Sequence, residues 1–375
     1  MDFAWETDQR DRYELVREKT RTWPAVEEGF LTREDWRRCA GLGLTGLSVP
    51  VEHGGGGLGF LSTARIVEAF GAGCPDMGLV FATMAHLFAC AMPVAEHGGA
   101  ELRARTLPGL CSGELIGANA ITEEGAGSDV TAITTRAVRA GDDYVITGAK
   151  SFVSNGPIAD VFTVYASTDP AFGHLGVSAF AVERDTPGLT VGEPFAKVGL
   201  ESVPASAVWL DGCRVPAGNR LGREGQGAAI FQSSMRWERT CLFAGYLGRT
   251  ERLLERCVEH ALERRQFGRR ISDNQAVSHR IARLRLRLEA ARLLLWQACW
   301  RLDQGERAVL DIAMAKLAVS EGAVQAGLDA VQILGGTGIR TDGGVERELR
   351  DALPATVFSG TSEMQLEQIV KELGL

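Results

Sequence analysis

The spacing of apolar residues changes twice along the chain, and these two changes constrain the fold more than any other feature of the sequence. Residues 1–114 are predicted to be helical, with two largely buried helices between Ser62 and Gly98. Residues 115–216 instead hold short runs rich in Val, Ile, Phe and Tyr, separated by Gly, Pro, Asp and Asn, which is typical of strands. Residues 217–375 return to the helical period. The sequence therefore predicts three domains with these boundaries.

Each of the two later regions predicts a specific architecture. The evenly spaced runs "DYVITGAKSFVSNG", "VFTVYAST", "GVSAFAVERD" and "SAVWLDGCRV" are typical of an antiparallel barrel. In the third region, apolar residues recur at alternating steps of four and three, which marks one face of a bundle helix: Val277, Ile281, Leu284, Leu288, Ala291, Leu295 and Ala298. A second long helix is expected to end at Gly335 and Gly336. The predicted fold class is α+β, with an N-terminal helical domain, a central antiparallel β-barrel and a C-terminal four-helix bundle.

Length and composition exclude several classes of protein. A chain of 375 residues exceeds what one hydrophobic core usually organises, and its net charge of -8 argues against a general nucleic-acid binder. The eight cysteines are scattered singly and the six histidines lack ligand spacing, which argues against a metal site and against disulfides. The N-terminal residues lack the pattern of a secretory signal, and we expect no apolar run near the ~20 residues that span a bilayer. These features predict a cytoplasmic protein with reduced thiols.

Two segments are candidates for contact with a phosphate. The loop "NAITEEGAGSDV" (119–130) lacks the third glycine of a dinucleotide-binding fingerprint, and its simplest interpretation is a flexible loop in which Ser128 and Asp129 cap a turn. The segment "ERRQFGRRISDNQ" (263–275) places four arginines around a Phe-Gly turn. These arginines could bind a pyrophosphate through bidentate contacts, or they could form a solvated basic link between two helices. The residues alone leave both interpretations open.

Two further segments hold candidate reactive groups. In "SSMRWERTCLFAGYLG", Glu238 lies among apolar residues, where burial would raise its pKa toward neutrality and suit a general base. The alternative is a surface ion pair between Glu238 and Arg236 or Arg239. In "TVFSGTSEMQ", Ser362 and Gln365 match the spacing of a capping box, and the backbone N–H groups of such a helix start attract an anion.

Together and in this order, these segments resemble the acyl-CoA dehydrogenase flavoprotein superfamily across essentially the whole chain. The motifs that carry the resemblance are "PVEHGGGGLG", "AITEEGAGSDV", "GAKSFVSNG", "ERRQFGRRISDNQ", "VQILGGTGI" and "FSGTSEMQ". The resemblance implies a helical domain, a β-barrel and a helical bundle in that order. It also implies FAD as the cofactor and a homotetramer as the assembly.

Position by position, the resemblance implies two sets of cofactor-binding residues. One set would lie beside the flavin in the same chain: Ile121, Thr122, Ser128, Phe152, Val153 and Ser154. The other would reach the FAD of a neighbouring subunit, with the last two residues near the cofactor: Arg264, Gln266, Phe267, Gln275, Gln332, Gly335, Gly336, Thr361 and Glu363. The basic link then becomes a diphosphate clamp between subunits.

The chain departs from the common pattern of the superfamily at Ser359. Most members carry a catalytic glutamate immediately before this Gly-Thr pair, and a serine hydroxyl cannot take an α-proton without a base of its own. The isovaleryl-type members instead take their base from the bundle helix, just before an arginine, and Glu238 falls on that position. The resemblance therefore implies that Glu238 is the catalytic base. It also implies that four residues contact or orient the substrate: Trp237, Arg239, Ser359 and Gly360.

Longer strings, including "FQSSMRWERTCLFAGYLG" and "SDNQAVSHRIARLRLRLEAARLLL", resemble L-prolyl-[peptidyl-carrier-protein] dehydrogenases, which form pyrrole units in natural-product and antibiotic biosynthesis. This resemblance implies a four-electron oxidation of an L-prolyl thioester on a peptidyl carrier protein. Glu238 would be the base, flavin N5 the hydride acceptor, and oxygen or an electron-transfer protein the final acceptor. Two alternatives remain: an isovaleryl-type acyl-CoA or acyl-carrier dehydrogenase that forms one double bond, and a non-catalytic flavin-binding paralogue.

Overall fold

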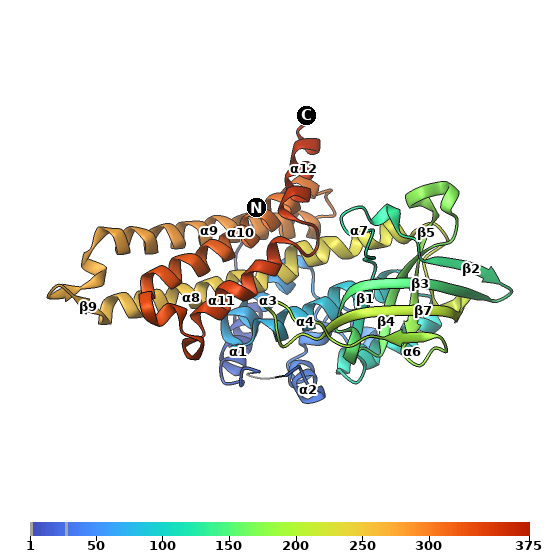
Figure 1. The fold of residues 1–375 in the computed structure, drawn as a ribbon, viewed down its shortest axis with the longest axis horizontal. Coiled ribbons are helices and arrows are strands. Elements are labelled where there is room, and N and C mark those ends of the chain that lie inside the picture. The colour runs from blue at the N-terminus through green and yellow to red at the C-terminus, as the bar shows by residue number, and fades with distance from the viewer. Residues whose placement is uncertain (1–2, 27–28) are drawn as a thin grey trace.

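The computed structural model describes residues 3–26 and 29–375 of the chain. Figure 1 shows the sheet at one end of an elongated molecule, with long helices of the C-terminal region extending to the other end and the N-terminal helices beside both. The helical regions share one continuous hydrophobic core, whereas the interior of the sheet forms a second core. The order predicted from the sequence, which is helices, strands and helices, is confirmed.

The N-terminal region contains six helices among the described residues: α1 (Thr7–Arg21), α2 (Arg33–Gly41), α3 (Phe60–Gly73), α4 (Met77–His86), α5 (Met92–His97) and α6 (Ala100–Ser112). A π-helical turn, Leu87–Ala91, joins α4 to α5. The two buried helices predicted from the sequence are therefore α3 and the continuous rod from α4 to α5.

The rod from α4 to α5 corrects one expectation from the sequence. Met77–His97 is 21 residues long, and its most apolar 18-residue window has a mean hydropathy of 1.7, so by length and composition it could cross a membrane. The prediction that no apolar run approaches spanning length was wrong here. Because 94% of the most apolar window is buried inside the protein, the apolar composition is accounted for by packing in the helical core.

The main sheet has eight strands: β1 (Gly117–Ala120), β2 (Arg136–Ala140), β3 (Asp143–Ser154), β4 (Val161–Ser167), β5 (Val177–Glu183), β6 (Leu189–Val191), β7 (Ala205–Pro216) and β8 (Arg220–Leu221). Their order is β6-β7-β3-β2-β4-β5-β8, and β1 pairs with β4. The predicted antiparallel arrangement needs a correction, because β1 and β2 both run parallel to β4. Two parallel strands need a long connection between them. The β2–β3 hairpin forms most of the connection between β1 and β4, so β4 can run in the same direction as β1.

The C-terminal region contains six helices among the described residues: α7 (Gly227–Trp237), α8 (Phe243–Glu263), α9 (Gln275–Asp303), α10 (Val309–Leu334), α11 (Val345–Ala352) and α12 (Ser362–Glu372). The long helices α8, α9 and α10 pack against one another, and α3 and α11 pack on this group. The predicted apolar face of α9 is confirmed, since Leu284, Leu288, Ala291, Leu295 and Ala298 are all buried. α10 ends at Leu334, before the left-handed Gly335, as predicted.

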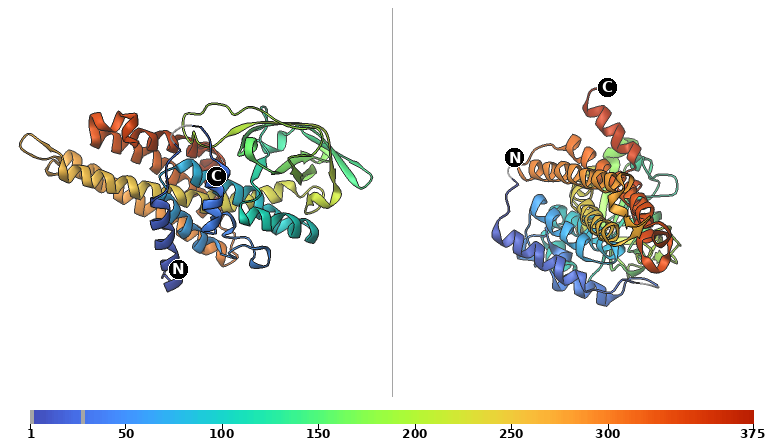
Figure 2. Two further views of the ribbon diagram at one scale, coloured as in Figure 1. Left: turned by 90° about the horizontal axis from the view of Figure 1, so that it is seen from below. Right: turned by 90° about the vertical axis from the view of Figure 1, so that its left-hand side faces the viewer.

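A short hairpin connects α8 to α9 and consists of β9 (Arg265–Gln266) and β10 (Arg269–Arg270). Figures 1 and 2 both show it at the tip of the bundle, at the end of the molecule opposite the sheet. The hairpin residues of the second predicted cofactor set therefore lie at the end of the molecule opposite the sheet, which holds most of the first set.

Candidate active site

Glu238 opens a π-helical turn, Glu238–Leu242, that joins α7 to α8 in the middle of the molecule. π-turns widen a helix and occur frequently at functional sites. The Glu238 side chain is buried, with 8% of the residue exposed. Burial raises the pKa of Glu238 to about 7, although a hydrogen bond from Ser359 and the charge of Arg239 both act to lower it. The interpretation of Glu238 as part of a surface ion pair is therefore wrong. The other interpretation, a buried carboxyl group with a pKa near neutrality, agrees with the structure.

The turn that precedes α12 brings Ser359 against Glu238. The Ser359 hydroxyl donates a hydrogen bond to the Glu238 carboxylate, and Arg239 Nε donates to the Ser359 carbonyl at 2.8 Å. Ser359 itself has a left-handed backbone, with φ of 55°, which is strained for a residue other than glycine. Gly360 follows with φ of 93°, and a Cβ there would lie 2.9 Å from Gln365 Nε2. The structure thus brings together four of the predicted site residues: Glu238, Arg239, Ser359 and Gly360.

The start of α12 differs by one residue from the predicted capping box. Thr361 is the N-cap, and its side chain accepts a hydrogen bond from the backbone N–H of Met364. Gln365 donates from Nε2 to the Gly360 carbonyl at 3.1 Å. The prediction that Ser362 pairs with Gln365 in a capping box was therefore wrong. The hydroxyl that caps the helix belongs to Thr361, the residue before Ser362, and Gln365 instead braces the Ser359–Gly360 turn.

The aromatic residues near Glu238 form two separate groups. The Trp237 ring stacks on Phe60, with ring centroids 3.7 Å apart, and on Phe88, with centroids 5.8 Å apart. Trp237 Nε1 also donates to Glu96 at 2.8 Å, which ties α7 to α5. The second group surrounds Phe358, the residue before Ser359, and consists of Phe81, Phe243 and Tyr246. Trp237 therefore braces the wall of the site, and Phe243 and Tyr246 support the C-terminal turn.

Five of the six residues in the first predicted cofactor set lie at the C-terminal end of β3 or in the loop that packs on it, whereas Ser128 lies farther along that loop and is exposed. Ser151 N–H donates to the Thr122 carbonyl at 2.8 Å, and the buried Lys150 donates to the Ile121 carbonyl at 3.1 Å and to Glu123 at 2.8 Å. These bonds hold the loop at residues 121–123 against the end of β3, where the predicted residues Phe152, Val153 and Ser154 lie. Asp129 also caps a short turn at Val130–Ala132, as predicted for this loop.

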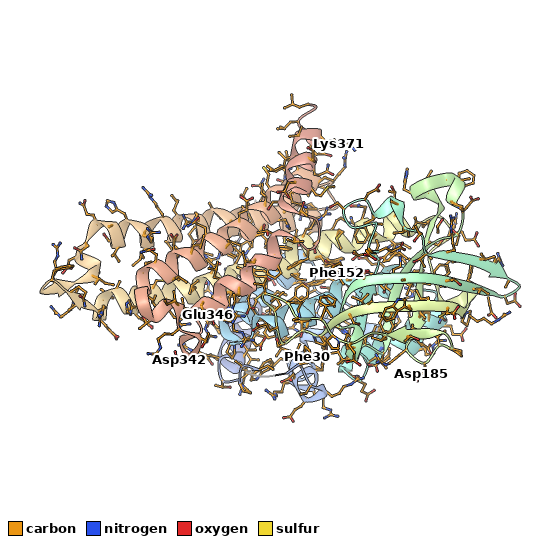
Figure 3. The ribbon with its side chains drawn as sticks, viewed as in Figure 1. Phe30, Phe152, Asp185, Asp342, Glu346 and Lys371 are labelled. Carbon is orange, nitrogen blue, oxygen red and sulfur yellow. The ribbon has the colours of Figure 1, made fainter. Side chains whose placement is uncertain are left out.

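Phe152 is the most informative member of this set. It is 67% exposed, its backbone is left-handed with φ of 55°, and its ring meets that of Phe195 edge-on at 5.4 Å. Figure 3 shows Phe152 where the sheet meets the helices. A large aromatic ring held outward by a strained backbone is suited to form the wall of a binding site. Val153, by contrast, is buried in the core of the sheet.

The second set lies at several places on the bundle. Phe267 is at the tip of the β9–β10 hairpin, 98% exposed, with φ of 52°. The exposed residues Arg264, Gln266 and Gln275 lie in or beside the hairpin, Gln332, Gly335 and Gly336 lie at the end of α10, and Thr361 and Glu363 lie at the start of α12. Within one chain the hairpin lies far from the end of β3, at the opposite end of the molecule. The role of these residues at the cofactor therefore stays a prediction that depends on a second subunit.

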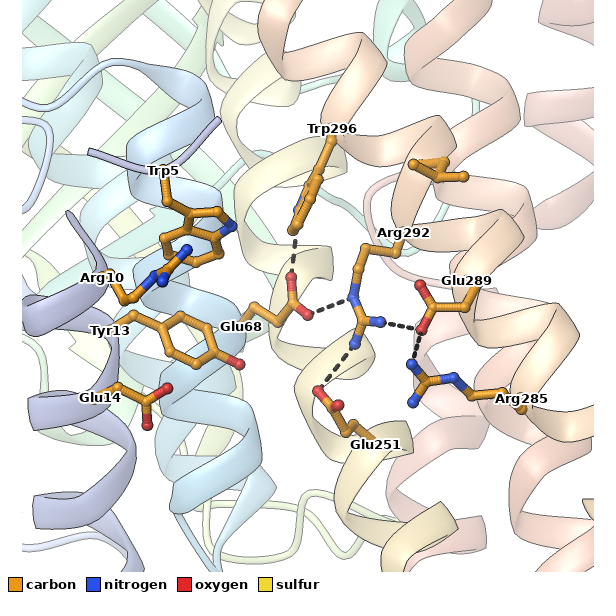
Figure 4. A pocket seen from close by; sticks show the side chains of 11 residues that line it. Trp5, Arg10, Tyr13, Glu14, Glu68, Glu251, Arg285, Glu289, Arg292 and Trp296 are labelled. Atoms are coloured by element: carbon orange, nitrogen blue, oxygen red, sulfur yellow. Dashed lines mark hydrogen bonds and ion pairs between the residues drawn. The ribbon is translucent and has the colours of Figure 1, made fainter. Parts of the chain in front are cut away.

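A cavity of about 290 Å³ lies elsewhere, among α1, α3, α8 and α9. Figure 4 shows its central ion pairs: Arg292 donates to Glu68 at 2.7 Å, to Glu251 at 2.9 Å and to Glu289 at 2.6 Å. Glu68 is buried, and burial raises its pKa although Arg292 opposes the shift. This network joins α3, α8 and α9, so we assign it to the stability of the fold.

Three buried polar residues near Glu238 or its neighbour Arg239 were not found from the sequence. Tyr165 Oη, Ser234 Oγ and Lys316 Nζ are buried and lack a hydrogen-bond partner within the described ranges. Burial lowers the pKa of Lys316 to about 8, and the nearby charge of Arg239 adds to that effect. Tyr165 and Lys316 lie inside a predicted strand and a predicted helix and in no motif, and Ser234 lies in the segment around Glu238 without having been singled out. Only the tertiary structure reveals that these polar atoms are enclosed.

Comparisons with known proteins agree with this arrangement. The chain matches three acyl-CoA dehydrogenase family models: the N-terminal domain over residues 13–114, the middle domain over 118–213 and the C-terminal domain over 225–374. It is 53% identical to an L-prolyl-[peptidyl-carrier protein] dehydrogenase of Pseudomonas fluorescens, with all of both chains covered. It is 43% identical to a protein of the same description from a Serratia species, covering 100% of this chain and 99% of that one.

A solved structure described as "PigA with FAD and proline" superposes with a TM-score of 0.97 at 43% identity, with all of both chains covered. The likeness therefore extends over the helices and the sheet alike. The chain belongs to the acyl-CoA dehydrogenase family.

Proposed function

We propose that this protein oxidises the L-prolyl group of a thioester on a peptidyl carrier protein to a pyrrolyl-2-carboxyl thioester, with FAD as cofactor. The full-length relatives described as L-prolyl-[peptidyl-carrier protein] dehydrogenases support the substrate, and the PigA structure with FAD and proline supports the cofactor. The observation that carries the proposal is the buried Glu238, whose pKa is about 7 and whose carboxylate accepts the hydroxyl hydrogen bond of Ser359.

The residues at the C-terminal end of β3 fit FAD. An isoalloxazine ring is planar and aromatic, so it needs an apolar wall, and the outward ring of Phe152 offers one. Thr122, Ser128 and Ser154 would contribute hydroxyl groups, and the positively charged hairpin of a second subunit would supply donors for the diphosphate. Bound there, the cofactor would supply a hydride acceptor for the substrate carbon next to the α-carbon.

The role of the protein's own residues follows from the geometry at Glu238. With a pKa of about 7, the carboxyl group is substantially ionised at neutral pH and can still take a proton, as a general base requires. The proton removed from the α-carbon passes to a carboxylate oxygen of Glu238. Ser359 fixes the orientation of the carboxylate, and Arg239 holds Ser359 through the carbonyl group. Backbone N–H groups of the Ser359–Thr361 turn would stabilise the charge that develops on the thioester oxygen.

Conversion of a prolyl group to a pyrrole removes four hydrogens in two rounds. Each round removes one proton and one hydride, so the external acceptor, oxygen or an electron-transfer protein, would have to reoxidise the cofactor after each round, and tautomerisation completes the aromatic ring. Glu238 must return its proton to solvent between rounds, which a pKa near neutrality permits.

The proposed assembly is a homotetramer. The β9–β10 hairpin, which carries the exposed Phe267 and its neighbouring arginines, lies at the tip of the bundle, at the end of the molecule opposite the sheet (Figure 2). A second subunit placed there would gain the donors that its cofactor needs. Oxygen and an electron-transfer protein are both compatible with these features, and turnover with and without oxygen separates the two acceptors.

The test is reduction of the bound flavin by defined substrates without oxygen. Carrier protein loaded with L-proline should bleach the flavin absorbance near 450 nm, as reduction of any flavin does, whereas carrier loaded with an isovaleryl group should not. Bleaching by the isovaleryl carrier alone would favour the branched-chain alternative. A flavin that stays oxidised with every thioester would favour a non-catalytic paralogue.

A further inference from the structure

A buried tyrosine beside the candidate base has a free hydroxyl group. Tyr165 is 0% exposed, and its Oη has no hydrogen-bond partner among the residues that the structure describes. A phenylalanine would fill the same space without enclosing a polar atom, and an enclosed hydroxyl that finds no partner costs free energy. The hydroxyl therefore calls for a partner that this chain does not supply.

The position of Tyr165 relates this hydroxyl to the site. Tyr165 lies on β4, yet its side chain joins the core shared with the helices rather than the interior of the sheet. Its ring meets Phe231 of α7 edge-on, with centroids 5.8 Å apart. Phe231, Ser234 and Glu238 are spaced by three and then four residues, so they share one face of α7. Tyr165 thus borders the helical face that ends at the Glu238 carboxylate.

Two further observations agree with this placement. Burial raises the pKa of Tyr165 most, and the charge of the Glu238 carboxylate is the second cause. The two groups are therefore close enough to interact. The hydroxyl of Ser234, on the same face of α7, is also buried and without a partner in the described part of the chain. Two buried hydroxyl groups without a hydrogen-bond partner in the described part of the chain, those of Tyr165 and Ser234, therefore lie near Glu238.

The chemistry of the substrate supplies such a partner. A prolyl thioester differs from a branched or carbocyclic acyl thioester by a ring nitrogen bonded to the α-carbon. Because Glu238 takes the proton of that carbon, the nitrogen is confined to the neighbourhood of Glu238. An amine buried there without a partner would bind poorly, whereas a phenol hydroxyl can both donate to it and accept from it.

We propose that Tyr165 hydrogen-bonds the ring nitrogen of the prolyl substrate and thereby selects prolyl over carbocyclic acyl thioesters. This inference rests on the proposed function and adds a specificity-determining residue to it. Sites built to pair a polar group of the substrate discriminate strongly against an analogue that lacks the group, because a buried atom of the protein is then left unpaired.

The test compares two variants of the FAD-loaded enzyme on two loaded carriers. Tyr165→Phe removes only the hydroxyl. Tyr144→Phe is the matched control, since Tyr144 is equally buried but its hydroxyl already accepts from Arg220 Nη1 at 2.6 Å. The carriers bear L-proline or cyclopentanecarboxylate, which has the same ring size without the nitrogen. Tyr165→Phe should lower kcat/KM for the prolyl carrier by about 10- to 100-fold and change that for the cyclopentanecarbonyl carrier by less than about threefold.

Each other outcome has a clear meaning. Equal losses on both carriers, or no loss on either, would overturn the role of Tyr165, as would a selective loss in Ser234→Ala instead. If Tyr165→Phe failed to retain FAD, the test would use the unmodified enzyme alone. A ratio of kcat/KM for the prolyl carrier to that for the cyclopentanecarbonyl carrier below about tenfold would then overturn the inference. Failure of the unmodified enzyme to oxidise the prolyl carrier would instead contradict the proposed function itself.

Discussion

Replacement of Glu238 by glutamine should abolish turnover and, at the same time, stabilise the protein at alkaline pH. The variant keeps the size and one hydrogen-bond acceptor of the side chain but cannot take a proton. Loss of a general base typically costs about 100- to 10,000-fold in rate. Bound FAD should be retained, because the change leaves the wall around Phe152 intact.

The stability gain follows from the pKa of Glu238. The rise from 4.5 to about 7 corresponds to a penalty of about 3 kcal/mol on the ionised group in the folded state. The folded protein binds this proton more tightly than the unfolded chain does. Stability due to this group is therefore present below about pH 4.5, is lost as pH rises, and the penalty is complete above about pH 7. Glu238→Gln escapes the penalty, so the variant should gain up to about 3 kcal/mol at pH 8 and little at pH 4.

The assay is urea denaturation of both proteins at pH 4 and at pH 8, alongside turnover of the prolyl carrier. Glu68→Gln is the matched control, since Glu68 is another buried glutamate but pairs with Arg292. The control should retain turnover and lose stability, because it leaves a buried guanidinium poorly compensated. Turnover of Glu238→Gln within tenfold of the unmodified enzyme would refute the role of the base. An equal stability difference at both pH values would refute the raised pKa.

Three further predictions test the surroundings of the base. Ser359→Ala removes a hydrogen bond that lowers the pKa of Glu238, so kcat/KM should fall about 3- to 10-fold at pH 7 and recover near pH 9; an unchanged pH profile would contradict the contact. Phe152→Ala should weaken FAD binding by about tenfold in a fluorescence titration while the free energy of unfolding changes by less than about 0.5 kcal/mol, because the side chain is 67% exposed. Phe267→Asp should yield smaller assemblies with less FAD by light scattering, whereas Phe172→Asp, a control that is 63% exposed on the sheet domain, should not; equal behaviour of the two would argue against the subunit contact.

The fold was predictable from the sequence where hydrophobic spacing is strong. The apolar face of α9 and the four longest strand runs are in the structure as predicted. β1 was missed because "GANA" has no strand propensity and is held in place by its pairing with β4. The parallel direction of that pairing could not be predicted either, since propensity specifies a strand but not its neighbour.

The site was only partly predictable, because its contacts join distant parts of the chain. Neighbouring arginines favoured a surface ion pair for Glu238, whereas the structure buries it and brings it a hydrogen bond from Ser359, 121 residues away. The predicted N-cap was misplaced by one residue, because two adjacent hydroxyls compete for one N-cap and the backbone decides between them. Tyr165 has no motif at all, and its unpaired hydroxyl becomes visible only when β4 packs against α7.

The most direct test of the central claim is the intact mass of the carrier protein after reaction. Prolyl-loaded carrier should lose the mass of four hydrogens with the FAD-loaded enzyme and remain unchanged with Glu238→Gln. Loss of two hydrogens as the final product would contradict the four-electron oxidation, and loss of four with the glutamine variant would contradict Glu238 as the base.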